Sequence, residues 1–262
     1  MFSDLNVFLE CEKNLPKRKF ILVTNDHRSD SSFVLHNMIS LFLKNSCPVI
    51  LVNIAQSFNH YHNVALKLGI NLKKVVEEGK LLCVDGLKLL NALIESYFEE
   101  QNCLNNPFSF IMNCREHSLM ELYLSIKKKV EMLDNSSTKD LNFLILIDDF
   151  SNLQSLGASN IEVINFINYC HSLILRKTGG CLVIGGSVDF DDEDSHVLLN
   201  CISHSSDTCI QINGLLTGQS RDVDGEITVT EKSGKLSKKI MQFKVEEKSV
   251  RLFARGTCSA VL

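Results

Sequence analysis

The amino-acid sequence predicts an α/β protein with a mostly parallel sheet, helices on both faces and an antiparallel extension at its C-terminal end. Two observations predict this fold. Short apolar runs alternate with segments of helical spacing through most of the 262 residues, which is the pattern of a parallel sheet covered on both faces. In the last fifth, short strands follow one another without long helices between them. We therefore expect a single domain over residues 1–262, with an α/β core at 1–212 and an antiparallel β extension at 213–262.

The predicted strands of the core are continuous apolar runs, as strands buried on both faces require. They are Phe20–Thr24, Val49–Ile54, Leu81–Val84, Phe143–Ile147, Cys181–Ile184 and Thr208–Ile212. Helical spacing of apolar residues occurs between them in Ser32–Lys44, His60–Leu68, Leu87–Glu99, Arg115–Leu133 and Ile161–Leu175. The strands expected in the extension are Glu226–Thr230, Ile240–Val245 and Ser249–Phe253.

Two adjacent carboxylates, Asp148 and Asp149, follow the apolar run of residues 143–147. ATPases with a phosphate-binding loop hold Mg²⁺ through a carboxylate at the end of such a strand. Acids also cap many buried parallel strands that bind nothing, so the pair alone is a weak signal. Its place after two strand–helix units favours a nucleotide-related origin, because ligands gather at the carboxyl ends of parallel strands.

The phosphate-binding loop itself is missing. The motif G-x-x-x-x-G-K-[ST] should follow the first strand, but residues 26–33 contain neither glycine nor lysine. Ser31 aligns best with the lysine position and Ser32 with the hydroxyl that binds Mg²⁺, while Asp26 and Asp30 bring negative charge to the place of the phosphates. Losing a charge-assisted hydrogen bond weakens binding by about 10- to 150-fold. We therefore expect these four positions, Ser31, Ser32, Asp148 and Asp149, to be vestigial, with no cofactor bound.

No catalytic or metal-binding group of residues replaces the lost site. There is no G-x-S-x-G elbow, and Cys181 lies inside an apolar strand, where a thiol is unreactive. The pair His60 and His62 has no cysteine or acid beside it, so a packing or surface role is expected rather than metal ligation. We expect no catalytic residue and no metal.

Composition limits the compartment and the partners. The net charge is −4 with a pI near 6.1, so the chain as a whole is not an electrostatic nucleic-acid binder. None of the ten cysteines forms C-x-x-C, and several lie in apolar segments, which indicates reduced, buried thiols in a cytoplasmic or nuclear protein. Neither a signal pattern nor an apolar stretch long enough to cross a membrane is present. The cysteines in apolar segments are Cys83, Cys170, Cys181, Cys201 and Cys209.

Two charged segments have competing interpretations. The acidic segment at 189–194 and the basic segment at 232–239 are each expected to be solvated loops. The alternatives are partner recognition by the acids and phosphate contact by the lysines. The candidate nucleic-acid residues are Lys232, Lys235, Lys238 and Lys239.

A set of short motifs also resembles a known family over nearly the whole chain. In order and spacing, short segments of this chain are similar to the corresponding segments of subunit six of the Elongator complex. They are Gln56–Phe58 with His60–Tyr61, Lys67–Gly69, Gly86–Lys88, Asp148–Ser151, Ser155–Gly157, Phe166–Cys170, Leu198–Asn200, Ser203–His204, Gly214–Leu215 with Thr217–Gly218, Arg221–Val223 with Gly225, Lys248–Val250 and Ala260–Leu262.

The resemblance implies a RecA-like three-layer α/β/α fold without intact nucleotide motifs. It also implies a non-catalytic role with subunits four and five in a six-membered ring that binds tRNA, while the chemistry on the wobble uridine belongs to the catalytic part of the complex. The alternative is a divergent RecA-type ATPase or recombinase. A recombinase should carry a basic loop facing the ring's centre, whereas the loop expected at Gly185–His196 is acidic and the one at Ser151–Asn160 is uncharged.

Head-to-tail rings bring one subunit's edge against the next subunit's nucleotide face. Arg221, Arg251 and Arg255 are the candidates to cross such an interface, with surface ion pairs as the alternative role.

Overall fold

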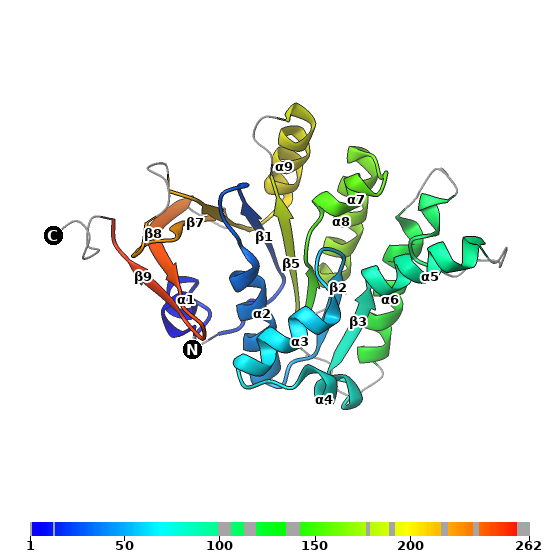
Figure 1. Ribbon diagram of the computed structural model, residues 1–262, viewed down its shortest axis with the longest axis horizontal. Coiled ribbons are helices and arrows are strands. Elements are labelled where there is room, and N and C mark those ends of the chain that lie inside the picture. The colour runs from blue at the N-terminus through cyan, green and yellow to red at the C-terminus, as the bar shows by residue number, and fades with distance from the viewer. Residues whose placement is uncertain are drawn as a thin grey trace.

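The computed structural model describes residues 2–12, 14–98, 106–112, 119–134, 142–176, 179–188, 192–215, 220–232 and 236–255. Nine strands form one sheet in the order β3-β2-β4-β5-β1-β6-β7-β8-β9 (Figure 1). The strands are β1 (Lys19–Asn25), β2 (Val49–Asn53), β3 (Leu81–Asp85), β4 (Phe143–Ile147), β5 (Gly180–Ser187), β6 (Thr208–Asn213), β7 (Gly225–Glu231), β8 (Ser237–Val245) and β9 (Val250–Phe253).

Helices cover both faces of the sheet, as expected from the alternation in the sequence. Leu5, Phe42, Tyr61 and Leu72 belong to one buried cluster, which places α1 to α4 on one face. The other buried cluster contains residues of α5 to α9. The helices are α1 (Ser3–Phe8), α2 (Ser32–Lys44), α3 (Phe58–Lys67), α4 (Leu72–Glu77), α5 (Gly86–Phe98), α6 (Met120–Asp134), α7 (Ser151–Ser155), α8 (Asn160–Leu175) and α9 (Glu193–Ser205), with a short 3-10 helix at Ser109–Ile111.

Strand β1 shows why the core strands are apolar throughout. Phe20 and Leu22 face the cluster under α5–α9, while Ile21 and Val23 face the cluster under α1–α4. All four side chains are buried, because successive side chains of a strand point to opposite faces. Full burial of such a side chain stabilises the fold by about 1.5–3 kcal/mol.

The antiparallel extension continues the same sheet. β1 to β6 pair in parallel, and β6, β7, β8 and β9 pair in antiparallel order. The three late strands expected from the sequence are confirmed, with β8 beginning three residues earlier than predicted. None of the helices in the described part of the chain has the length and apolar character needed to cross a bilayer.

Two expected loops contain helices. The segment Ser151–Asn160 holds α7, and the acidic segment ends in α9, which starts at Glu193. Asp192 caps α9 by accepting hydrogen bonds from the N–H groups of Asp194 and Ser195. Acids in the first turn also suit the positive end of a helix. The loop interpretation is therefore wrong for Glu193 and Asp194, which begin α9, although their side chains are exposed as expected. Asp189 and Asp191 lie outside the described residues.

The cysteines in the described part of the chain are mostly buried. Cys170, Cys181 and Cys209 are buried and Cys83 is partly buried, but Cys201 is exposed on α9. Burial raises the pKa of the Cys83 thiol to about 12, so a thiolate is disfavoured there.

Candidate functional site at the carboxyl ends of the parallel strands

The loop between β1 and α2 is held together by Asp26. Its carboxylate is buried and accepts hydrogen bonds from the Arg28 backbone N–H at 3.1 Å, the Arg28 guanidinium at 3.1 and 2.8 Å, and the Ser29 hydroxyl at 2.7 Å. The N–H of Gly214, at the end of β6, donates to it as well, at 3.2 Å. Burial alone raises the pKa of Asp26, but the bonds from Ser29, Arg28 and Gly214 outweigh it and hold the pKa below its ordinary value.

The polar groups at the N-terminus of α2 are also hydrogen-bonded within the chain. Ser31, at the lysine position, is buried and donates its hydroxyl to Asn25 Oδ1 at 2.9 Å. Ser32, at the Mg²⁺-hydroxyl position, donates its backbone N–H and its hydroxyl to Asp30 at 2.8 and 2.7 Å. An aspartate of this chain thus receives the helix N–H that a phosphate would take in a phosphate-binding loop.

Asp148 is hydrogen-bonded to the connection between β2 and α3. Its carboxylate accepts from the N–H groups of Ile54 at 2.7 Å and of Ala55 and Gln56 at 3.1 Å, and not from the degenerate β1–α2 loop. The reason is topological, because β2 is the neighbour of β4, whereas β5 lies between β4 and β1.

Asp149 binds groups on its own turn and on β5. Its carboxylate accepts from the backbone N–H of Ser151 at 2.8 Å and from the Ser187 hydroxyl at 3.3 Å. β5 approaches this turn closely. A Cβ atom on Gly185 would lie 2.2 Å from the backbone oxygen of Asp148, and one on Gly186 would lie 2.1 Å from the Phe150 ring. The two glycines therefore permit the contact that fixes both carboxylates.

A buried histidine beside Tyr61 was not identified as a site residue from the sequence. His36 on α2 lies 5.0 Å from the Tyr61 ring and 5.7 Å from the His60 ring, measured between centroids. Tyr61 in turn donates its hydroxyl to Asp148 at 3.4 Å. Burial lowers the pKa of His36 to about 4, with a smaller contribution from His60, so the ring is neutral at pH 7. The only sequence signal was a histidine within the apolar stripe of α2.

The hollow beside Asp149 does not suit a phosphate. It has a volume of about 500 Å³ and is lined mainly by hydroxyl and amide groups, together with His27 and Val188, and by no lysine or arginine. Asp192 contributes a carboxylate to it. A second hollow, of about 480 Å³, contains Arg28, but that guanidinium is already bonded to Asp26. Among the described residues, no cluster of three or more His, Cys, Asp or Glu side chains is arranged to hold a metal.

Comparison with known proteins identifies the family. The sequence model described as Elongation complex protein 6 matches residues 2–247. The chain belongs to this family. It is 31% identical to Elongator complex protein 6 of Homo sapiens and 34% identical to that of Xenopus laevis, and each alignment covers the whole of both chains.

Solved structures support the fold of this family member. An uncharacterised protein of Pyrococcus horikoshii, crystallised with an unknown peptide, matches with a TM-score of 0.64 at 14% identity, covering 97% of this chain and 98% of that one. A KaiC-like protein of Pyrococcus horikoshii matches with a TM-score of 0.55 at 11% identity, covering 91% and 90%. At such identities the likeness concerns the fold alone, and the expected RecA-like three-layer fold is confirmed.

The three candidate interface arginines all lie in the antiparallel extension or beside it. Arg221 is exposed and takes part in no ion pair within the described residues. Arg251 lies 3.6 Å from Glu246, and Arg255 binds both carboxylate oxygens of Glu226 at 2.8 and 2.7 Å. Of the three, Arg221 has the side chain most available to another chain.

The basic segment of this family member does not act as one patch. Lys232 donates to the backbone oxygen and, at 3.0 Å, to the hydroxyl of Ser203 at the end of α9, where a cation suits the helix dipole. Lys239 pairs with Glu10. Lys238 is exposed, and Lys235 lies outside the described residues.

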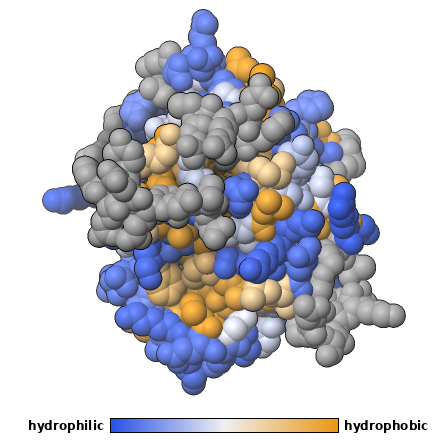
Figure 2. All heavy atoms as spheres, turned by 90° about the vertical axis from the view of Figure 1, so that its right-hand side faces the viewer, coloured by the Kyte–Doolittle hydropathy of each residue, from blue (hydrophilic) through white to orange (hydrophobic). Residues whose placement is uncertain are grey.

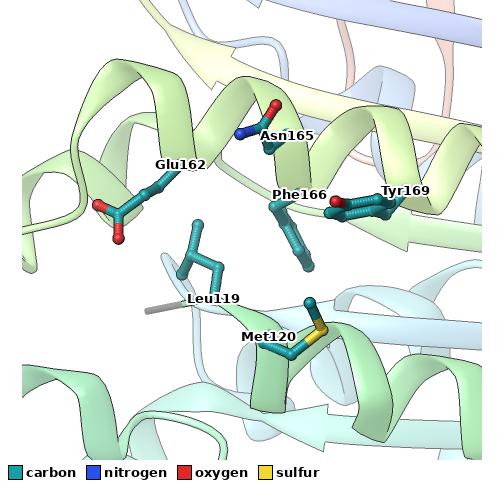
Figure 3. Close-up of a pocket in the computed structure, with 6 residues that line it drawn as sticks. All are labelled: Leu119, Met120, Glu162, Asn165, Phe166 and Tyr169. Carbon is teal, nitrogen blue, oxygen red and sulfur yellow. The ribbon is translucent and has the colours of Figure 1, made fainter. Parts of the chain in front are cut away.

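A small cavity between α6 and α8 lies away from the strand ends. Figure 3 shows Met120 and Leu119 approaching Phe166 and Tyr169 from the opposite helix. The cavity has a volume of about 70 Å³, which is far below the several hundred Å³ typical of ligand sites. It is therefore too small to be a candidate cofactor site.

Proposed function

We propose that this member of the family is a non-catalytic subunit of the Elongator complex. In this proposal it joins subunits four and five in a six-membered RecA-like ring, which binds tRNA and supports wobble-uridine modification by the catalytic part of the complex. Membership in the family supports the link to Elongator, since its relatives are named Elongator complex protein 6. The fold supports the ring, because RecA-like subunits can associate head to tail.

The hydrogen bonds that Asp26 and Asp30 form within the β1–α2 loop are the observation that supports the non-catalytic role. Asp26 uses the only cation of the β1–α2 loop, Arg28, together with the Ser29 hydroxyl. Asp30 uses the first N–H of α2. Phosphates brought to this loop would meet two carboxylates and no free cation of the loop, and the electrostatic stabilisation that phosphoryl transfer requires would be absent.

Calorimetric titration of the full-length chain with Mg²⁺-ATP tests the loss of nucleotide binding. We expect no binding in the low micromolar range and no hydrolysis above background. A titration of a working ATPase under the same conditions is the control. A dissociation constant in the low micromolar range would falsify this proposal and favour the divergent ATPase or recombinase.

Mass measurement of the chain, alone and mixed with subunits four and five, tests the assembly. We expect a hetero-hexamer containing all three subunits. Arg221→Glu should weaken this assembly if Arg221 crosses an interface. Lys248→Glu, at an exposed turn between β8 and β9, provides a control with a matched charge change. A stable monomer with no affinity for either partner contradicts the ring.

A further inference from the structure

A hollow between α1 and α2 lies away from the ends of the strands. It has a volume of about 290 Å³, close to the lower end of the range of ligand pockets, about 300–1,000 Å³. Asn6 of α1 lines it together with Asn37 and Ser40 of α2. Ser32 begins α2 at the strand-end site, and Ser40 lies about 12 Å further along the helix axis. The hollow is therefore separate from the site described above.

Two buried polar side chains in this lining lack hydrogen-bond partners for some of their atoms. Asn37 and Ser40 are only 2% and 4% exposed. Asn37 Nδ2 donates to Asn6 Oδ1 at 2.8 Å, which leaves Asn37 Oδ1 and Asn6 Nδ2 without a partner in the described part of the chain. The Ser40 hydroxyl has no partner there either. Buried polar groups are nearly always hydrogen-bonded, so these atoms require partners that enter the hollow.

The unbonded atoms are accessible from the hollow. Among the described residues, the fully enclosed side-chain atoms that lack a partner belong to three other residues, Asn53, His62 and Gln242. Water satisfies such polar groups where there is room for it, and a ligand that reproduces the hydrogen bonds of water can displace it. The hollow thus offers an amide donor, an amide acceptor and a hydroxyl group that can act as either.

The other residues of the lining favour a neutral ligand. Glu12 and Lys44 are exposed residues of opposite charge, so the net charge of the lining selects neither an anion nor a cation. Phe2 and Leu41 are buried residues that also line the hollow. They provide apolar surface against which the face of a ring can pack. Ligand pockets commonly combine such apolar surface with a few placed polar groups.

We propose that this hollow binds a small neutral molecule that carries a carbonyl oxygen beside an N–H group, as a pyrimidine base or a carboxamide does. The carbonyl oxygen accepts a hydrogen bond from Asn6 Nδ2, and the N–H donates to Asn37 Oδ1. The Ser40 hydroxyl bonds to a further polar atom of the ligand. The rest of the molecule packs against Phe2 and Leu41. The proposal does not depend on the role in the ring.

The exposed apolar area of the molecule lies elsewhere and supplies a control. Figure 2 shows this area below its centre, on the side where Figure 1 places β3, α5 and α6. Figure 1 places α1 at the opposite end of the molecule, where it contacts β9. A flat ring can rest on an apolar surface without directed hydrogen bonds. Ile94 on α5 is 51% exposed, so a substitution there detects such nonspecific binding.

NMR titration of the full-length chain tests the proposal. The probes are uracil and nicotinamide, which carry the same polar edge on a ring imide and on a carboxamide, and the tighter of the two identifies the source of the ligand. The controls are a dimethylated uracil without N–H groups and benzoate, which is charged. We expect roughly millimolar dissociation constants, as is usual for such small ligands. Only the two probes should shift the side-chain amide signals of Asn6 and Asn37.

Protein variants separate ligand binding from a structural role. Ser40→Ala removes a hydroxyl group without a partner in the described fold, so it should leave the free energy of unfolding unchanged and weaken uracil binding by about 2- to 10-fold. Asn6→Asp keeps the oxygen that accepts from Asn37 but replaces the free donor with an acceptor, and should weaken binding by about tenfold or more. Ser172→Ala, at an exposed serine of α8, and Ile94→Ser should leave binding unchanged.

Several outcomes would overturn the proposal. They are the failure of both probes to bind, which would leave water as the only occupant, equal binding of the dimethylated uracil, and signal changes at α5 in place of the hollow. A loss of stability in Ser40→Ala would also overturn it, because the hydroxyl would then be bonded within the protein. Urea unfolding of each variant provides that measurement.

Discussion

The carboxylate of Asp148 occupies the position of a Mg²⁺ ligand, but it serves as an acceptor for three backbone N–H groups of the β2–α3 connection. Removing it leaves these buried donors unsatisfied, at a cost of about 1–3 kcal/mol for each group. We expect Asp148→Ala to lower the free energy of unfolding by about 3 kcal/mol or more and to leave Mg²⁺-ATP titrations unchanged. Urea unfolding measures the first effect and calorimetry the second. A variant as stable as the parent contradicts this role.

The pair Asp148 and His36 predicts opposing pH dependences. Burial raises the pKa of Asp148 from 3.8 to about 6, despite the backbone hydrogen bonds that lower it. The folded state therefore binds more protons through Asp148 over this window, and that contribution to stability is lost as the pH rises to 6. Burial lowers the pKa of His36 from 6.5 to about 4, so the contribution of His36 is lost as the pH falls to 4.

These slopes oppose each other between pH 4 and 6, so removing one titration exposes the other. We expect His36→Phe, which keeps a ring against Tyr61, to lose stability as the pH rises through this range, relative to the parent chain. Denaturant unfolding at several pH values measures the slope. Ring contacts with His60 and the charge of Asp30 also act on His36, so a variant at a distant histidine, His204→Phe, is the control. Identical slopes for parent and His36→Phe would refute the assignment.

At the scale of the element, α8 has an N-terminus defined by its own sequence. Ser159 accepts from the N–H of Glu162, and Glu162 accepts from the N–H of Ser159, which is a capping box. Ser159→Ala should lower the free energy of unfolding by about 1 kcal/mol, while Ser159→Asp should retain most of the stability. Ser155→Ala, on the exposed surface of α7, is the matched control. Equal losses for both alanine variants would show that capping is not the cause.

Strong periodicity made most elements predictable, whereas short or polar elements were missed. The apolar runs at β4 and α2 gave boundaries that match the structure. Helices α1, α4 and α7 have five or six residues, too few for a helical period to stand out. The acids that begin α9 resemble a loop when charge alone is considered. The contact from Asp148 to the β2–α3 connection depended on strand order, which one sequence does not reveal.

For the whole molecule, the carboxyl ends of the parallel strands carry negative charge. The rim around the strand ends is acidic and hydroxyl-rich, with Asp26, Asp30 and Asp148 all engaged in internal bonds. The lysines of the late segment include two, Lys232 and Lys239, that already bind groups of this chain. In the proposed ring, the strand-end rim would therefore contribute unfavourably to tRNA binding, and we expect basic residues of the neighbouring subunits to dominate it.

Neutralising the acidic segment in the assembled ring tests whether these acids oppose tRNA binding. The variant carries Asp189→Asn, Asp191→Asn, Glu193→Gln and Asp194→Asn, and it retains Asp192 because that side chain caps α9. Phosphate binding depends on cations displacing counterions, so tRNA affinity should stay the same or rise when it is measured at two salt concentrations. Lys238→Gln, which removes an exposed lysine, should weaken binding by about twofold at most, because a single exposed charge contributes little. A large loss of affinity in the acid-neutralised ring, with assembly intact by mass measurement, would show that the acids form a positive part of the tRNA site.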